Sequence, residues 1–266
     1  MAELTIGLVL PDVLGTYGDD GNALVLRQRA RMRGFDAGIH RITLGDAVPE
    51  GLDVYTVGGG EDVAQTLAAE HLIADGGMTR AVNAGCPVLA ICAGLQVFGH
   101  SFRASDRMVD GLGLIDATTS SLQTRMIGEL KSVPAKQGMR APGMEELTEP
   151  LTGFANHQGA TILGPDARPL GHVTHGTGNT DAHGALTAGL SPETAKVEVY
   201  HEGAVQGSVI ATYMHGPVLA RNPQLADLLL AKATGVALAD LPPMTGAFAE
   251  QLTGEVATLR AERMKA

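Results

Sequence analysis

The sequence predicts an α/β protein with a doubly wound, mostly parallel sheet, flanking helices and a C-terminal helical extension. Short apolar segments, typical of strands buried on both faces, alternate with helical segments over the first 100 residues. Two of these apolar segments end at clusters of small residues. In open α/β folds, functional sites lie at the carboxyl ends of the strands. We expect one domain over 1–236 and the extension over 237–266, because Gly235 ends the last helix of the domain.

The elements of the first half follow one another closely. The predicted strands are 4–10, 37–44, 54–57 and 87–92, and the predicted helices are 22–33, 61–74 and 78–84. The first helix should end at Gly34. Its predicted inward face is formed by Leu24, Leu26, Ala30 and Met32.

The second half changes character before regular elements return. Between about 112 and 196 the chain is rich in Gly, Thr and Pro, so we expect strands and loops laid over the parallel core. A strand follows at 208–214, and Asn222 and Pro223 then start a helix. The extension has one apolar stripe at helical spacing, formed by Phe248, Leu252, Val256 and Leu259. We expect this stripe to pack on its own domain; docking to a partner is the alternative.

Composition excludes several classes of function. The net charge of −10 argues against a nucleic-acid surface, which needs a basic stripe. We expect no membrane span, because no run reaches about 18 apolar residues, and the acidic N-terminus does not fit a signal peptide. We therefore expect a cytoplasmic protein. The two cysteines, Cys86 and Cys92, cannot build a tetrahedral zinc site alone, and we predict no metal site.

Cys92 is the candidate nucleophile. It stands where a buried strand ends, with Ala90 two residues before it and Gly94 two residues after it. A sharp strand-to-helix turn that exposes a nucleophile requires small residues at these positions. The helix that follows places its positive end near the sulfur and favours the thiolate. A buried structural cysteine is the alternative, and Cys86, at a strand start, is assigned that role.

A glycine triplet at 58–60 ends the neighbouring predicted strand. The N–H groups of Gly59 and Gly60, with that of Ala93, are candidates for an oxyanion hole. Phosphate binding is the rival use of such a loop. No Gly-Lys-Ser/Thr follows the triplet, however, and Glu61 and Asp62 would repel a phosphate.

A thiol nucleophile needs a base, and nine histidines are present. His215 lies just beyond a late apolar strand, so it can reach the same edge of the sheet as Cys92. His40, His71 and His183 have polar or irregular surroundings and are expected to be solvated. We therefore predict that His215 accepts the proton of Cys92 and returns it to the leaving group.

Three segments in order resemble the class I glutamine amidotransferases: 58–60, 91–96 and 213–217. More narrowly, they resemble the branch of the cobyric and cobyrinic acid enzymes and, within it, the GatD glutaminase subunits of lipid II isoglutaminyl synthase. Supporting segments are 17–22, 26–30, 171–174 and 176–179. The likeness covers most of the chain, from Leu4 to about Gly235.

The resemblance implies that Cys92 and His215 act as a dyad that hydrolyses L-glutamine. It implies that Arg125 holds the carboxylate of the substrate, and it makes Gln96 and His157 further candidates for substrate binding. Many class I enzymes carry a glutamate two residues after the histidine. Pro217 stands there in this chain, which agrees with a dyad. Ala155 occupies a position where related sequences tend to have glutamate.

The resemblance also implies a partner. Ammonia would pass to a Mur-ligase-like subunit of the MurT type, which would amidate D-glutamate of the lipid II stem peptide to D-isoglutamine. No cofactor is expected on this chain, whereas ATP and Mg²⁺ are expected on the partner. Three alternatives remain: a glutaminase that serves corrinoid amidation, a non-catalytic scaffold of the same fold, and a thiol hydrolase of the related peptidase-like group. The corrinoid enzymes usually carry an ATP-binding domain, and this sequence has no P-loop.

Overall fold

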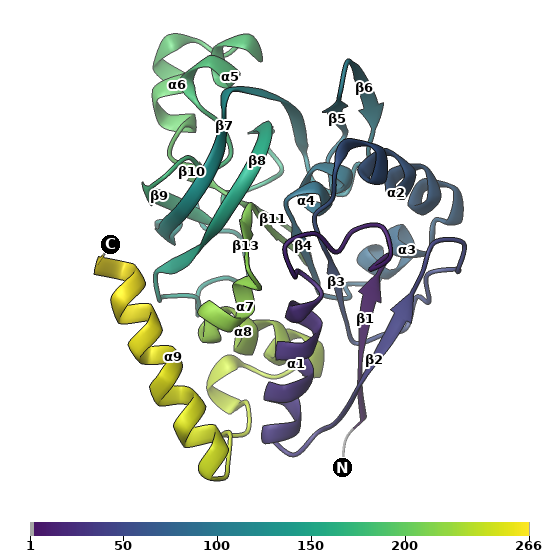
Figure 1. The fold of residues 1–266 in the computed structure, drawn as a ribbon, viewed down its shortest axis with the longest axis vertical. Helices are drawn as coiled ribbons and strands as arrows, with labels where there is room; N and C mark the ends of the chain where they lie inside the picture. The colour runs from purple at the N-terminus through teal and green to yellow at the C-terminus, as the bar shows by residue number, and fades with distance from the viewer. Residues whose placement is uncertain (1–2, 266) are drawn as a thin grey trace.

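The centre of the molecule is a six-stranded sheet, seen in a computed structural model that describes residues 3–265 (Figure 1). Its strands pair in parallel except for β11, which forms an antiparallel edge. In spatial order the strands are β11 (Ala204–Gln206), β12 (Val209–Thr212), β4 (Val88–Ile91), β3 (Val54–Val57), β1 (Glu3–Val9) and β2 (Asp36–Ile42). β12, β4 and β3 are buried along their whole length, as the continuous apolar segments predict.

Helices cover both faces of this sheet, which confirms the predicted doubly wound α/β class (Figure 1). One face is covered by α1 (Gly21–Met32), the short α7 (Val218–Arg221) and α8 (Pro223–Thr234). The other is covered by α2 (Asp62–Asp75), α3 (Gly77–Asn83) and α4 (Ala93–Phe98). The predicted strands and helices of the first half are therefore present, with bounds shifted by one or two residues.

A second, largely antiparallel sheet lies beside the first (Figure 1). Two long strands, β7 (Ala117–Pro134) and β8 (Leu151–Leu163), form its main hairpin. The remaining strands are β5 (Ser101–Ala104), β6 (Arg107–Asp110), β9 (Gly171–His175), β10 (His201–Glu202) and β13 (Met214–His215). The predicted strands of the middle region are thus confirmed, but two short helices there, α5 (Ala182–Thr187) and α6 (Pro192–Glu198), were not predicted.

The strand predicted at 208–214 is wrong in one respect, because it is two strands in two sheets. β12 pairs with β4 in the first sheet, whereas β13 pairs with β8 in the second, with His215 opposite Phe154. The chain crosses between the sheets at Tyr213, which is fully buried. This crossing places His215 above the edge of the parallel sheet.

Two side chains on the helices differ from the prediction. Leu24 is 49% exposed, while Leu26, Ala30 and Met32 are buried as expected. Asn222 precedes α8, but its side chain does not cap that helix. Its amide instead bonds to the backbone of Thr152 on β8 and of Val218 on α7, and so joins the second sheet to the helical layer.

The C-terminal segment contains a 3₁₀ turn, η1 (Leu238–Asp240), and the long helix α9 (Ala247–Lys265). The predicted stripe packs on the domain only in part: Leu252, Val256 and Leu259 are half-buried, and Phe248 is 60% exposed. No helix within residues 3–265 is long and apolar enough to cross a bilayer. The boundary after residue 236 stays a prediction.

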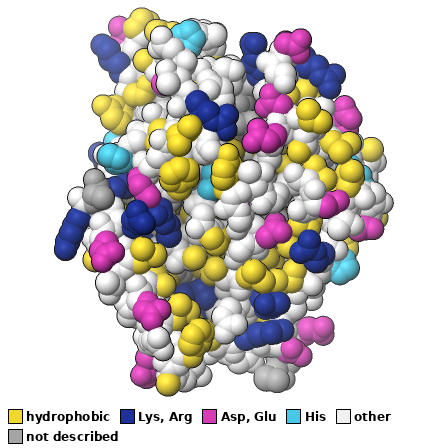
Figure 2. Space-filling model, in the orientation of Figure 1, with side chains coloured by type: hydrophobic (Ala, Val, Ile, Leu, Met, Phe, Trp, Pro, Cys, Tyr) yellow, Lys and Arg dark blue, Asp and Glu magenta, His cyan; other side chains and the backbone are white. Residues whose placement is uncertain are grey.

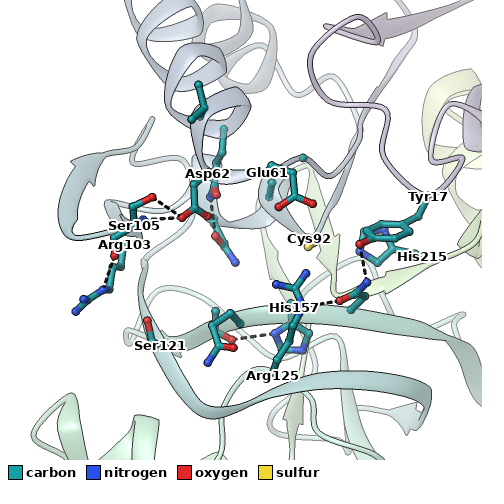
Figure 3. A pocket seen from close by; sticks show the side chains of 18 of the residues that line it. Tyr17, Glu61, Asp62, Cys92, Arg103, Ser105, Ser121, Arg125, His157 and His215 are labelled. Atoms are coloured by element: carbon teal, nitrogen blue, oxygen red, sulfur yellow. Dashed lines mark hydrogen bonds between the residues drawn. The ribbon is translucent and has the colours of Figure 1, made fainter.

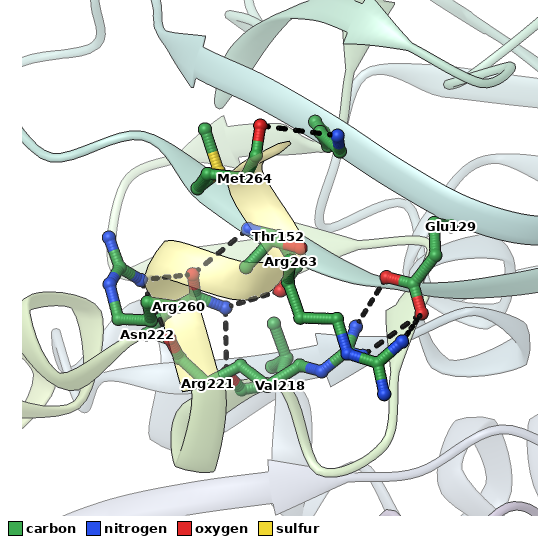
Figure 4. Close-up of polar contacts among 9 residues, drawn as sticks. Glu129, Thr152, Val218, Arg221, Asn222, Arg260, Arg263 and Met264 are labelled. Atoms are coloured by element: carbon green, nitrogen blue, oxygen red, sulfur yellow. Dashed lines mark hydrogen bonds and ion pairs between the residues drawn. The ribbon is translucent and has the colours of Figure 1, made fainter. Parts of the chain in front are cut away.

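Polar contacts hold the end of α9 (Figure 4). Arg260 donates to the carbonyl oxygens of Arg221, at 2.6 Å, and Pro150, at 2.8 Å. Arg263 and Arg221 both meet the carboxylate of Glu129 on β7. Guanidinium groups therefore attach the end of α9 in addition to its half-buried apolar stripe.

Charged side chains of both signs are scattered over the face shown in Figure 2, and the basic ones form no continuous stripe there. This distribution agrees with the net charge of −10.

A buried carboxyl group, Glu202, braces the crossing between the two sheets. Its Oε1 accepts from the Thr212 hydroxyl at 2.5 Å and from the Tyr213 N–H at 3.3 Å, while its Oε2 is buried without a partner among residues 3–265. The Thr212 carbonyl in turn accepts from the N–H of Cys92 at 2.9 Å. Burial raises the pKa of Glu202 from 4.5 to about 7, more than its hydrogen bonds lower it.

Replacement of Glu202 with glutamine should remove the free-energy cost of ionising a buried carboxyl group, which depends on pH. Because the folded pKa lies above the unfolded value, the wild type loses stability as pH rises from 4.5 to 7, by up to about 3 kcal/mol. A glutamine oxygen can keep both accepted hydrogen bonds without ionising. In urea unfolding, we expect the free energy of unfolding of Glu202→Gln to rise relative to that of the wild type between pH 5 and pH 8. A difference between the two proteins that does not change with pH would contradict this.

Candidate active site

The carboxyl ends of four neighbouring strands meet at one edge of the first sheet. The loops after β1, β3 and β4 carry Asp19, the triplet 58–60 and Cys92, and His215 lies just beyond β12. A cavity of about 400 Å³ opens at this edge, and both Cys92 and His215 line it (Figure 3). The candidate residues of distant segments therefore share one site.

Cys92 has the geometry of a nucleophile elbow. Its φ of 52° and ψ of −103° are strained for a residue with a side chain, and α4 begins directly after it. Gly94 lies so close to β3 that an added Cβ would stand 3.1 Å from the Val57 carbonyl oxygen and 3.2 Å from that of Gly58. The small residue after the cysteine thus allows the turn to pack against the sheet.

His215 is held by a carboxylate that the sequence did not reveal. Its Nδ1 lies 2.9 Å from Asp19 Oδ2, and both side chains are almost fully buried. Burial lowers the pKa of His215, but the Asp19 carboxylate and the neighbouring Cys92 sulfur raise it more, to about 10. Nε2 is buried and has no hydrogen-bond partner among residues 3–265, so it is the nitrogen left to face the thiol.

Gly59 lies between the three groups. A Cβ built on it would stand 2.8 Å from His215 Cε1, 3.2 Å from Asp19 Oδ2 and 3.3 Å from Cys92 Cβ. The contact with His215 is shorter than real Cβ contacts and the other two are tighter than most, so any side chain here would force the catalytic groups to move. The sulfur, the imidazole and the carboxylate therefore converge around one bare backbone position.

These contacts change two predictions. The expected dyad did not include Asp19, which contacts the Nδ1 atom of His215. The predicted oxyanion role of Gly59 conflicts with the structure, since its N–H donates to Asp19 Oδ2 at 2.9 Å. The N–H groups of Gly60 and Ala93 have no hydrogen-bond partner within residues 3–265 and remain candidate donors.

Arg125 enters the cavity from β7, where the register between β7 and β8 shifts (Figure 3). Its Nε donates to Asn156 Oδ1 at 2.7 Å, and Asn156 Nδ2 donates to the Tyr17 hydroxyl at 2.6 Å. The Tyr17 ring meets the His215 ring edge-on, with centroids 4.9 Å apart. The Nη groups of Arg125 stay available to a ligand, as the predicted carboxylate contact requires.

Gln96 and His157 line the same cavity, but other side chains engage them. Gln96 accepts from Gln65 at 2.6 Å and donates to the Tyr213 hydroxyl at 3.1 Å. His157 stacks on the Tyr213 ring, with centroids 3.7 Å apart, and donates from Nδ1 to the Gly159 carbonyl. Burial lowers the pKa of His157 to about 4, which keeps it neutral. Their contact with substrate stays a prediction.

Sequence reasoning missed Asp19, Tyr17, Asn156 and Gln65. The first two belong to segment 17–22, which carried part of the family resemblance without an assigned role, and which follows β1 at the catalytic edge. That position was the signal that could have identified Asp19. Residues 3–265 contain no cluster of three or more His, Cys, Asp or Glu side chains arranged to hold a metal ion.

For L-glutamine, the substrate that the resemblance implies, replacement of Arg125 with alanine should raise the KM about 10- to 100-fold, since a charge-assisted pair is worth roughly 1.5–3 kcal/mol. The kcat should change far less, because the guanidinium contacts a group remote from the scissile amide. Arg103→Ala is the matched control: Arg103 also lines the cavity, but its guanidinium points away from Cys92 (Figure 3). An unchanged KM in Arg125→Ala would refute the assignment.

Comparison with known proteins places this geometry in context. Residues 5–223 match the CobB/CobQ-like glutamine amidotransferase domain. The GatD subunit of lipid II isoglutaminyl synthase from Staphylococcus aureus is 33% identical over 88% of this chain and 85% of its own length. The GatD subunit from Streptococcus pneumoniae is 32% identical over 87% of this chain and 80% of its own length.

A solved structure supports the fold. The crystal structure of a glutamine amidotransferase superposes with a TM-score of 0.53 and 19% identity, over 86% of this chain and 98% of the other. At that identity the likeness concerns the arrangement of sheet and helices alone.

Proposed function

Because the chain belongs to the CobB/CobQ-like glutamine amidotransferase family, we propose that it hydrolyses L-glutamine at Cys92 and supplies the ammonia to a separate ligase subunit. The observation that carries this proposal is the convergence of the strained Cys92, the buried His215 and Asp19 around Gly59. In this proposal the three act as a triad, with Asp19 as the group that orients His215.

The chemistry follows from these positions. The Cys92 thiolate attacks the side-chain carbonyl carbon of glutamine, and the oxygen that becomes negative is received by the N–H groups of Gly60 and Ala93. His215 gives its proton to the leaving nitrogen, so that ammonia departs and a thioester remains on Cys92. Water, deprotonated by His215, then cleaves the thioester to glutamate and restores the thiolate.

The acceptor of the ammonia in this proposal is D-glutamate of the lipid II stem peptide. The support is the likeness to two GatD subunits of lipid II isoglutaminyl synthase, which extends over 87% or more of this chain. The partner would be a Mur-ligase-like subunit of the MurT type that binds ATP and Mg²⁺ and activates the carboxylate. Because ATP is a cytoplasmic substrate, we place the reaction in the cytoplasm.

Reconstitution tests the whole proposal. The chain and a Mur-ligase-like subunit from the same genome should co-purify and, with L-glutamine, ATP and Mg²⁺, convert lipid II to its amidated form. Ammonium chloride in place of glutamine should restore amidation when Cys92→Ala replaces the wild type. Amidation that depends on ATP but never on this chain would contradict the proposal.

A second candidate acceptor is a corrinoid carboxylate, which the likeness to a probable cobyric acid synthase, 31% identical over 68% of this chain, favours. Parallel assays with lipid II and with a corrinoid acid separate the two candidates by product mass. Labelling with a glutamine-like electrophile distinguishes either glutaminase candidate from a non-catalytic scaffold, because only an active site should form a covalent adduct at Cys92.

A further inference from the structure

We propose that Glu61 binds the α-ammonium group of L-glutamine, across the cavity from Arg125, and so selects substrates that carry both charges on the α-carbon. This inference rests on the proposed function, since it assigns a part of the substrate of that same site. The triplet 58–60 ends immediately before Glu61, so a residue next to the candidate oxyanion donors would also fix the far end of the substrate.

Two oppositely charged side chains point into the cavity from opposite sides (Figure 3). Glu61 stands before the first residue of α2, in extended backbone with φ −77° and ψ 162°, and its exposed carboxylate points toward the space above Cys92. The guanidinium of Arg125 enters from β7 on the other side of the sulfur. The nucleophile therefore lies between a carboxylate and a guanidinium whose Nη groups have no hydrogen-bond partner within residues 3–265.

The other charged groups of the cavity wall are engaged elsewhere. Asp62, next in the chain, accepts from the Ser105 N–H at 2.6 Å and from its hydroxyl at 2.9 Å. Arg103 donates to the Ser105 carbonyl and points away from Cys92. Among the described residues that line the cavity, Glu61 is the carboxylate with no hydrogen-bond or ion-pair partner. By elimination, it is the anion that can receive a ligand.

The chemistry of glutamine matches this pair of charges. Its α-carbon carries one ammonium and one carboxylate group, and its side-chain amide must reach Cys92. An ammonium that meets Glu61 and a carboxylate that meets Arg125 fix two substituents of the α-carbon, while the side chain is the third. Three fixed substituents distinguish L-glutamine from D-glutamine and from glutaramate, which lacks the amino group.

Binding measurements test the assignment without turnover. Calorimetry on Cys92→Ala should show L-glutamine binding that Glu61→Gln, added to the same protein, weakens about 10- to 100-fold. Glutaramate should bind Cys92→Ala more weakly than L-glutamine does, and Glu61→Gln should leave its affinity unchanged. Asp62→Asn is the matched control and should alter neither ligand more than about threefold.

Kinetics on chains with intact Cys92 provide a second readout. Glu61→Gln should raise the KM for L-glutamine by a similar factor with kcat within a few-fold, and should leave kcat/KM for glutaramate unchanged. The proposal is overturned if Glu61→Gln weakens both ligands equally or neither, or if L-glutamine does not bind at millimolar concentration. If glutamine binds in this pattern but is never hydrolysed, the proposed function fails and this inference stands.

Discussion

Replacement of Cys92 with alanine should reduce glutamine hydrolysis by at least about three orders of magnitude, because no other thiol faces His215 within the described cavity. The protein should stay folded, because Cys92 follows the buried strand β4 and the side chains of Val88–Ile91, not the sulfur, form the packing of that strand. Ammonia release with a coupled dehydrogenase assay measures the loss. Cys86→Ala is the control: Cys86 is half-buried, outside the cavity, and should leave the rate unchanged.

The same position allows a second measurement. A residue with a side chain at φ 52° stores strain on the order of 1–3 kcal/mol, which glycine does not bear. Cys92→Gly should therefore be as inactive as Cys92→Ala but more stable than it in urea unfolding. Full activity in either variant would refute the nucleophile, and a Cys92→Gly protein less stable than Cys92→Ala would refute the strained turn.

Replacement of Asp19 with asparagine should lower kcat by roughly 10²- to 10⁴-fold with a smaller change in KM. The carboxylate at 2.9 Å from His215 Nδ1 fixes the ring and stabilises its protonated form; an amide does neither reliably. It also accepts the N–H of Gly59, so the glycine loop should loosen as well. Stopped assays at saturating glutamine measure this change.

The pH dependence of activity distinguishes a loss of the Asp19–His215 interaction from a general disruption of the fold. Asp19 helps raise the pKa of His215 to about 10, so its neutralisation should lower that pKa and move the alkaline limb of the rate profile to lower pH. Asp20→Asn, one residue along, is the matched control, because the carboxylate paired with His215 is that of Asp19 and not that of Asp20. A rate within threefold of wild type in Asp19→Asn would leave the site as the dyad that the sequence suggested.

The parallel core could be predicted from the sequence because its signals are local. Continuous apolar runs such as Val88–Ile91 are typical of buried strands, and the small residues around Cys92 favour the sharp turn that follows. Parallel topology then brings strand ends together, which is why His215 could be assigned to the same edge from its position alone.

The parts that could not be predicted depend on contacts between distant segments. The position of Asp19 after β1 indicates the catalytic edge, but its contact with His215, 196 residues away, has no local pattern that would indicate it. The mostly apolar segment 208–214 predicts one continuous strand, whereas Glu202 and the pairing of Met214 with Ala155 place its end in another sheet. Similarly, the apolar stripe on α9 predicts packing on the domain, but it does not indicate the arginine contacts that also attach this helix.

The lack of a side chain at Gly59 limits which positions of this enzyme can be varied by mutagenesis. A single methyl group there would press at once on the ring, the acid and the sulfur-bearing residue. Mutational libraries that vary the residues lining the cavity should therefore keep glycine at position 59. The absence of a Cβ atom there lets Cys92, His215 and Asp19 lie close together.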